Sequence, residues 1–379
     1  MSISKAFQTG TILSLAISLG GWSLVGQGQT LDDVESVPLP GEQNSGFEEV
    51  VLGDSFPQDS WENLQAAYPT CGRCGECEHC RRGWFNLILC DTWPRWTVQV
   101  DALLLWRGNI PSQPLFRLIG PDTVALDTNS LQTPATGGPR FGLFLHLDNC
   151  FAIEGNYFLV DGFNGEKTLP PGDYYFEDIA GIVPPGQLIR SDVATATSGG
   201  KIQSAEMNWR RRADLVTWLA GFRWVQWNES LNITSREGTN LNDTIDVGVG
   251  NDLYGGQAGC DLRVYELGQW LRVNALGKAG IFYNPAHQMT SVNSPENIQF
   301  AGSSQAEQTA FFGEFGVNAT VQIRQWLGWR VGYSLFWLSG VATAAEQLSV
   351  VNAQARTSGI NTNGSVLLQG VTTGIEARW

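Results

Sequence analysis

From Pro94 to the C-terminus, apolar and polar residues alternate in short runs separated by segments rich in glycine, proline and small polar residues. A period of two is typical of a β-strand with one apolar and one polar face. The alternation recurs about ten times, and most runs approach the roughly 9–11 residues with which a tilted strand crosses a bilayer. The predicted strands are residues 96–104, 139–147, 151–160, 201–210, 214–231, 251–264, 270–283, 308–322, 329–338 and 366–379.

The connecting segments alternate strictly between short and long. The short ones are residues 148–150, 211–213, 265–269 and 323–328, and the long ones are 108–138, 161–200, 232–250, 284–307 and 339–365. Bacterial outer-membrane barrels have short periplasmic turns, long external loops and an even number of strands. A β-sandwich has no reason to alternate its loops in this way. The pattern therefore predicts an up-and-down barrel with its short turns in the periplasm.

The last predicted strand, 366–379, ends on Trp379. Counting back in twos from this residue gives a mostly apolar face, and the other face carries charges and glycines. The final strand of an outer-membrane barrel pairs with the first, so we expect 366–379 to close on Trp96–Arg107. Trp96 and Trp379 would then lie at the membrane interface, and the outer-membrane assembly machinery would recognise this strand. The closure would place Glu376 and Arg378 inside the barrel, facing Gln99, Asp101 and Arg107.

Composition supports the same fold. The 379 residues include 44 Gly and 15 Trp, and only 16% are charged, which is below the usual share of about a quarter in soluble domains. We predict an all-β chain that forms a single up-and-down antiparallel transmembrane β-barrel of about ten strands, in a range of roughly 8–14. A secreted soluble β-sandwich is the alternative fold.

The N-terminal part differs from the rest. Residues 1–28 resemble a signal peptide, because Lys5 is the only charge before a short apolar stretch. Residues 29–92 are predicted to be an irregular periplasmic segment, and residues 31–95 hold twelve acidic and four basic side chains of a chain with net charge −14. The barrel would occupy 93–379. No basic patch with interleaved aromatic residues suggests binding to nucleic acid.

Charged residues occur on the polar face of the predicted strands, so we expect them inside the barrel. The candidates for lining the lumen are Asp101, Arg223, Arg263, Arg272, Lys278, Glu314, Arg330, Glu376 and Arg378. Lys278 and Glu314 lie on adjacent strands and could pair. Because side chains fill an eight-stranded barrel, a barrel of about ten strands favours a closed network of these charges. A narrow pore with a preference for anions is the alternative.

Four cysteines lie three residues apart in the N-terminal segment, at Cys71, Cys74, Cys77 and Cys80. In an oxidising periplasm such cysteines form disulfides, and a zinc or iron–sulfur site on the same four thiolates is the alternative. The total of seven cysteines is odd, so one is left free or bridges another chain. Apart from this metal alternative, no cofactor is predicted.

Enzyme signatures are absent from the sequence. It contains no G-x-S-x-G, H-E-x-x-H or P-loop pattern. Its three histidines, His79, His146 and His287, fall on the N-terminal segment, a predicted strand and a predicted loop. We therefore predict that the protein is not an enzyme.

Four stretches resemble the putative beta-barrel porin family, type seven, of planctomycete bacteria. They are ALLLWR (102–107), LAGFRW (219–224), NDLYGGQ (251–257) and RVGYSLFWL (330–338), and the resemblance covers roughly 93–379. It implies an outer-membrane barrel embedded in the lipid bilayer. We expect a porin-like channel for small solutes; the alternative is a closed structural or surface-interaction barrel whose long external loops bind the partner. The sequence leaves the solute and the oligomeric state open.

Overall fold

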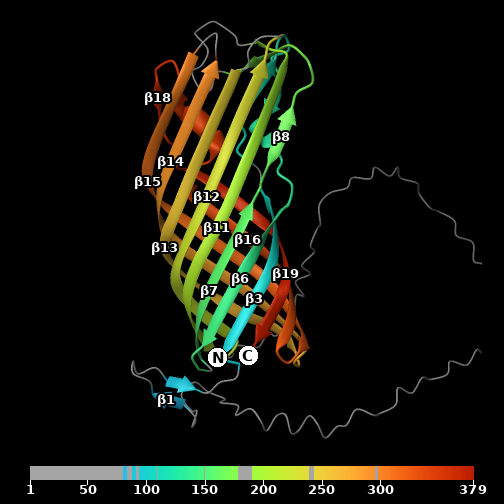
Figure 1. Ribbon diagram of the computed structural model, residues 1–379, viewed down its shortest axis with the longest axis vertical. Helices are drawn as coiled ribbons and strands as arrows, with labels where there is room; N and C mark the ends of the chain where they lie inside the picture. The colour runs from blue at the N-terminus through green and yellow to red at the C-terminus, as the bar shows by residue number, and fades with distance from the viewer. Residues whose placement is uncertain are drawn as a thin grey trace, which may run out of the picture. The chain divides into compact units, whose positions relative to one another are not determined.

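Ten antiparallel strands close into a ring in the computed structural model (Figure 1). Around the ring the order is β12, β13, β14, β15, β16, β19, β3, β6, β7 and β11, and β11 pairs with β12 to complete it. The strands are β3 (Trp96–Arg107), β6 (Thr136–His146), β7 (Phe151–Asp161), β11 (Val193–Ala213), β12 (Val216–Arg236), β13 (Asp243–Leu267), β14 (Leu271–Ser294), β15 (Ile298–Arg324), β16 (Leu327–Val341) and β19 (Gly364–Arg378). The predicted barrel of about ten strands is confirmed, and the β-sandwich alternative is wrong.

The structure describes residues 94–379 except 109, 149, 178–189, 239–242 and 295–297, together with the backbone of 80–82 and 88–90. The predicted signal peptide, 1–28, lies outside the described residues, as does most of the segment 29–92. Within the latter, the backbones of β1 (Cys80–Arg82) and β2 (Ile88–Cys90) pair antiparallel.

The terminal strand closes the barrel as predicted. Pairing between β19 and β3 runs from Leu368 opposite Arg107 to Arg378 opposite Thr97. Beyond the ladder, the Trp96 N–H donates to the Trp379 carbonyl (2.8 Å), and the Trp379 N–H donates back to Trp96 (3.0 Å). These bonds satisfy backbone groups at the seam, which leaves no open sheet edge there.

Three of the short connectors overlap the predicted ranges. The fourth prediction is wrong: residues 211–213 belong to β11, because its ladder with β12 continues to Ala213 opposite Val216, and Asp214 and Leu215 form the turn.

Several strands are also much longer than expected. Residues 232–250 and 284–307 were expected to be loops, whereas β13 begins at Asp243, β14 continues to Ser294 and β15 begins at Ile298. In this extension apolar and polar residues still alternate, but the apolar residues now point inward and the polar ones outward. On β13, for example, Ile245, Val247 and Val249 are buried in the interior. The strands stay paired because apolar side chains fill the interior while the outer face tolerates water.

The described parts of the other long segments are folded as well. A four-stranded sheet is formed, in order, by β10 (Arg190–Ser191), β9 (Tyr174–Phe176), β4 (Pro114–Leu118) and β5 (Val124–Asp127), and β8 (Gly165–Thr168) pairs with β11. Segment 339–365 contains α2 (Ala344–Gln347), η2 (Leu348–Val350) and the strand pair β17 (Val351–Asn352) and β18 (Thr357–Ser358), and η1 (Thr128–Ser130) follows β5. No described helix has the length and apolar character needed to span a bilayer.

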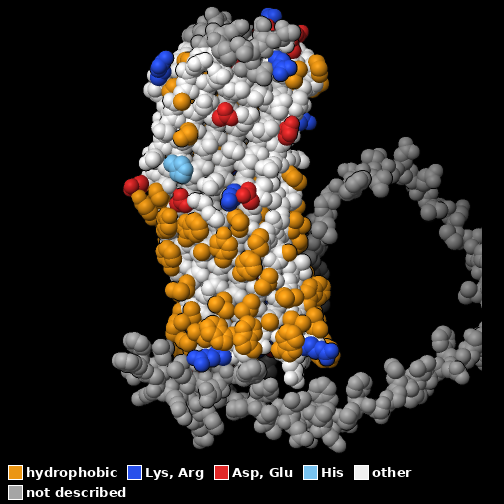
Figure 2. Space-filling model, viewed as in Figure 1, with side chains coloured by type: hydrophobic (Ala, Val, Ile, Leu, Met, Phe, Trp, Pro, Cys, Tyr) orange, Lys and Arg blue, Asp and Glu red, His pale blue; other side chains and the backbone are white. Residues whose placement is uncertain are grey.

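An apolar belt surrounds the half of the barrel that holds the short turns. Figure 2 shows hydrophobic side chains gathered over this half and sparse on the other, with Lys and Arg below the belt. Exposed aromatic residues bound it: Tyr157, Tyr254, Tyr283 and Trp337 above, and Trp209, Trp218, Trp270, Trp326, Trp329 and Trp379 below. A closed antiparallel barrel with an apolar band between aromatic girdles is the architecture of bacterial outer-membrane proteins. The chain is an outer-membrane β-barrel.

Candidate functional site: the interior of the barrel

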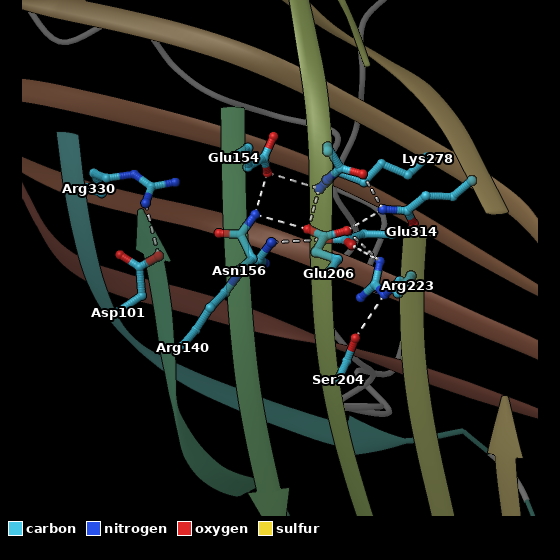
Figure 3. A network of polar contacts seen from close by, with 12 residues as sticks. Asp101, Arg140, Glu154, Asn156, Ser204, Glu206, Arg223, Lys278, Glu314 and Arg330 are labelled. Atoms are coloured by element: carbon cyan, nitrogen blue, oxygen red, sulfur yellow. Dashed lines mark hydrogen bonds and ion pairs between the residues drawn. The ribbon is translucent and has the colours of Figure 1, made fainter. Parts of the chain in front are cut away.

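Charged side chains meet inside the membrane half of the barrel (Figure 3). Because successive side chains of a strand point to opposite faces, an apolar outer face leaves every second position to the lumen. The charged residues come from all ten strands of the ring: Asp101, Arg140, Glu154, Glu206, Arg210, Arg223, Asp261, Lys278, Glu314, Arg330 and Glu376. Most of their ion pairs join strands that are not neighbours, such as Lys278 with Glu154 and Arg140 with Glu314, whereas Arg210 with Glu154 joins adjacent strands.

Lys278 on β14 reaches across the interior. Its Nζ lies 2.5 Å from Glu206 Oε1 on β11 and 3.2 Å from Glu154 Oε1 on β7. Glu314 lies directly opposite Lys278 in the β14–β15 ladder, as expected, but the two do not form an ion pair within 4 Å. The reason is that both Glu314 oxygens are occupied by guanidinium groups, which leaves the lysine to the two carboxylates opposite.

Glu314 is the best-enclosed carboxylate of the network. Arg223 donates to Oε2 (2.6 Å) and Arg140 donates to Oε1 (2.9 Å). The Arg223 and Glu314 side chains are each 1% exposed. The Arg223 guanidinium also donates to the Ser204 hydroxyl (2.8 Å) and lies 4.2 Å from the centre of the Phe312 ring. Arg223 thus joins the charged layer to an aromatic layer.

The aromatic layer belongs to a cluster of buried apolar residues from every barrel strand except β6. Its members on the strands are Leu103, Leu105, Phe158, Val160, Ile202, Val225, Trp227, Leu253, Phe282, Ala310, Phe312, Phe336, Leu338, Val341, Val366 and Leu368. Arg107 is held here, pairing with Glu229 at 2.8 Å and lying over the Trp227 ring. It is therefore remote from Arg378, contrary to the expectation that the two would line the same part of the lumen.

A second apolar cluster fills the extended half of the barrel. It combines inner-face residues of β11 to β14 with residues of the small sheet, α2 and η2, such as Phe116, Ala345 and Leu348. The charged network, the aromatic layer and this upper core together occupy the interior from the membrane half to the outer end.

At the opposite end, the interior opens into a cavity of about 400 Å³. Asp148, Cys150, Asp214 and Leu215, at the short turns, line its mouth, so it faces the periplasm. Its walls carry Gln99, Arg140, Phe144, His146, Glu154, Arg210, Asp261, Arg263, Arg272, Asn274, Leu276, Asn318, Thr320, Arg330, Glu376 and Arg378, among others. We call this cavity the periplasmic vestibule.

The predicted lumen residues divide between two places. Arg223, Lys278 and Glu314 belong to the buried network, and Asp101 joins it through Arg330, whose guanidinium lies 3.0 Å from the Asp101 carboxylate. Arg263, Arg272 and Arg378 line the vestibule, and Glu376 belongs to both places, because it lines the vestibule and lies 3.9 Å from Arg330.

Sequence reasoning missed Arg140, Glu154, Glu206 and Arg210 as members of the network. Arg140, Glu154 and Glu206 occupy polar positions of predicted strands, so extending the face assignment to residues 139–160 and 201–210 would have found them. Arg210 bridges Glu154 (2.6 Å) and Asp261 (2.5 Å).

The remaining candidate residues lie elsewhere. The side chains of Cys71, Cys74, Cys77 and Cys80 lie outside the described residues, as does His79. Cys150 is disulfide-bonded and Cys260 is a free thiol. Among the described residues, no group of His, Cys, Asp and Glu has the arrangement of a metal site.

The two described histidines lie on strands. His146 on β6 is within hydrogen-bond distance of the Thr97 hydroxyl (3.0 Å). His287 lies on β14, not in a loop as expected, because that strand extends beyond the membrane belt; its ring lies over Gly250 on β13.

No protein-family model and no curated protein matches the chain, so the resemblance to the planctomycete porin family is not confirmed. Solved structures similar to the chain include the outer membrane protease OmpT from Escherichia coli (11% identity, 76% of this chain and 98% of that one, TM-score 0.42). Others are the translocator domain of the autotransporter NalP from Neisseria meningitidis (8%, 76% and 90%, 0.35) and a major outer membrane protein from Thermus thermophilus (11%, 75% and 99%, 0.28).

Proposed function

We propose that the protein is a closed outer-membrane barrel that acts by presenting its external half to a binding partner. One observation carries the proposal: two successive layers fill the cross-section of the lumen. The ion network forms one layer, and the other contains Trp227, Phe312 and Phe336, each of which is at most 1% exposed. A continuous water path would have to displace both layers.

The energetics favour the closed state. Separating a buried ion pair leaves an unpaired charge, at a cost of about 3–5 kcal/mol. Exposing a large buried aromatic side chain to water costs a further ~1.5–3 kcal/mol. A porin-like role for small solutes, the first expectation from the sequence, is therefore the less favoured function.

The external half offers the binding surface. Its strands extend past the aromatic girdle, polar residues cover their outer face, and the small sheet and α2 pack onto the upper core. Folded loops on a rigid barrel lose less conformational entropy on binding than long irregular loops do. Within this proposal the lipid bilayer and the outer-membrane assembly machinery, acting on β19, remain the other expected partners.

Single-channel recording in a planar bilayer tests the closed state. We expect the purified full-length protein, with insertion verified by flotation of proteoliposomes, to give no resolvable conductance steps. A porin inserted in the same bilayer is the positive control. Stable, reproducible steps from the inserted protein would overturn the proposal and favour the channel.

A further inference from the structure

One wall of the periplasmic vestibule carries more guanidinium groups than carboxylates. Arg378 donates to Glu376 Oε1 (2.7 Å), while Arg330 Nε and an Arg272 terminal nitrogen lie 3.9 Å from the same carboxylate. Gln99 donates to its other oxygen (2.8 Å). Glu376 is therefore shared by three arginines, and among the described residues only Arg330 has a second carboxylate within 4 Å, that of Asp101.

Arg272 and Arg378 are the accessible members of this wall. Their side chains are 32% and 24% exposed, against 14% for Arg330. The ion pair of Arg272 with Glu376, at 3.9 Å, is longer than a hydrogen bond. A guanidinium has five N–H donors in a planar fork, more than the contacts with Glu376 use, so both accessible residues retain donors for another ligand.

We propose that the periplasmic vestibule is a binding site for a small oxyanion of the carboxylate or phosphate class. Arg272 and Arg378 would bind it, since a guanidinium fork matches the oxygen spacing of these groups. Asn318 and Thr320 add polar atoms to the wall, and Phe144 offers an apolar surface to the body of an organic anion. The cavity of about 400 Å³ is within the usual range of small-molecule sites.

This site goes beyond the proposed function and lies at the other end of the molecule. Its upper boundary is the buried network, so an anion that enters from the periplasm meets a blind end. Conductance reports on the lumen and binding reports on the vestibule, so either proposal can fail without the other.

Calorimetric titration of the full-length protein in zwitterionic detergent, at low salt, tests the site with citrate and inorganic phosphate as separate probes. We expect saturable binding of at least one probe, and its identity shows which class the site prefers. Arg272→Gln and Arg378→Gln are each expected to weaken binding about tenfold, which is the loss of one charged hydrogen bond. Arg324→Gln, an exposed arginine at the end of β15 and not part of the vestibule lining, should leave it unchanged.

Thr320→Asp provides a second variant that keeps both arginines. Thr320 lies directly opposite Arg272 in the β14–β15 ladder, so the new carboxylate should occupy the guanidinium and lower anion affinity. Heat-modifiable gel migration verifies the fold of each variant. Absence of binding of both probes to the folded wild-type protein would overturn the proposal, as would equal weakening by Arg324→Gln.

Discussion

At the residue scale, the network depends on carboxylates that each lie next to two cations. Glu314 accepts from Arg223 and Arg140, and Glu206 accepts from Lys278 at 2.5 Å and lies 3.5 Å from Arg223. In a water-excluded interior such a group is costly to leave unpaired, although the complete network adds little net stability over a well-packed apolar interior. Removing a single charge from the network should therefore lower the stability of the barrel more than the net contribution of the whole network would suggest.

Glu314→Gln is expected to destabilise the barrel by about 3–5 kcal/mol, because two buried guanidinium groups would lose their common counter-charge. Urea unfolding in lipid vesicles measures the change. Glu307→Gln is the matched control, since Glu307 is exposed on the same strand, β15, and should shift stability by less than ~0.5 kcal/mol. Equal losses of stability for the two variants would contradict a charged Glu314 that pairs with Arg140 and Arg223.

At the scale of elements, the seam between β19 and β3 depends on a close approach of the two backbones. A Cβ added at Gly370 would lie 1.9 Å from the Leu104 carbonyl oxygen and 2.8 Å from the Leu105 Cα. Backbone atoms cannot yield in the way that a flexible side chain does, so this position requires glycine. Glycine at this inner-face position thus allows the backbones of β19 and β3 to approach closely enough to pair.

Gly370→Ala is expected to lower the stability of the folded barrel by about 1–3 kcal/mol through steric strain at the seam. The fraction of protein with heat-modifiable migration, followed against urea, measures this loss. Gly277→Ala on β14 serves as the control, because a Cβ there meets no atom within 4 Å. A Gly370→Ala variant as stable as Gly277→Ala would contradict the predicted strain.

At the scale of the whole molecule, the outer surface divides the barrel into a half in lipid and a half in water. On β15, Val317 lies opposite Ala275 in the belt half, whereas Ala301 lies opposite Ser291 in the extension, and both are exposed on the outer face. The same strand therefore passes through two solvents, and a charge should have a different cost in each.

Val317→Lys should destabilise the barrel in lipid vesicles by ~2–4 kcal/mol, the cost of a lysine near the bilayer midplane. For Ala301→Lys we expect a change within ~0.5 kcal/mol, since the site is in water. Urea titration of both variants in the same vesicles gives the comparison. Similar losses of stability for the two variants would contradict a membrane boundary between these two positions of β15.

What the sequence by itself determined was local and periodic: the number of barrel strands, the closure of 366–379 on 96–107, the short turns, and the outward apolar face. The alternation of apolar and polar residues is a property of each strand's own sequence, so it is recognisable without knowledge of which strands lie next to it. The extension beyond the belt was missed, because β13 and β14 exchange their apolar and polar faces there while their composition is that of loops.

Only the tertiary structure decided which charges pair and whether the lumen is filled. Lys278 pairs across the interior with Glu154, 124 positions away, and not with its ladder neighbour Glu314. Such pairs depend on the curvature, tilt and stagger that the strands adopt when the ring closes. The contents of the lumen are a property of the closed ring, so no single strand encodes them.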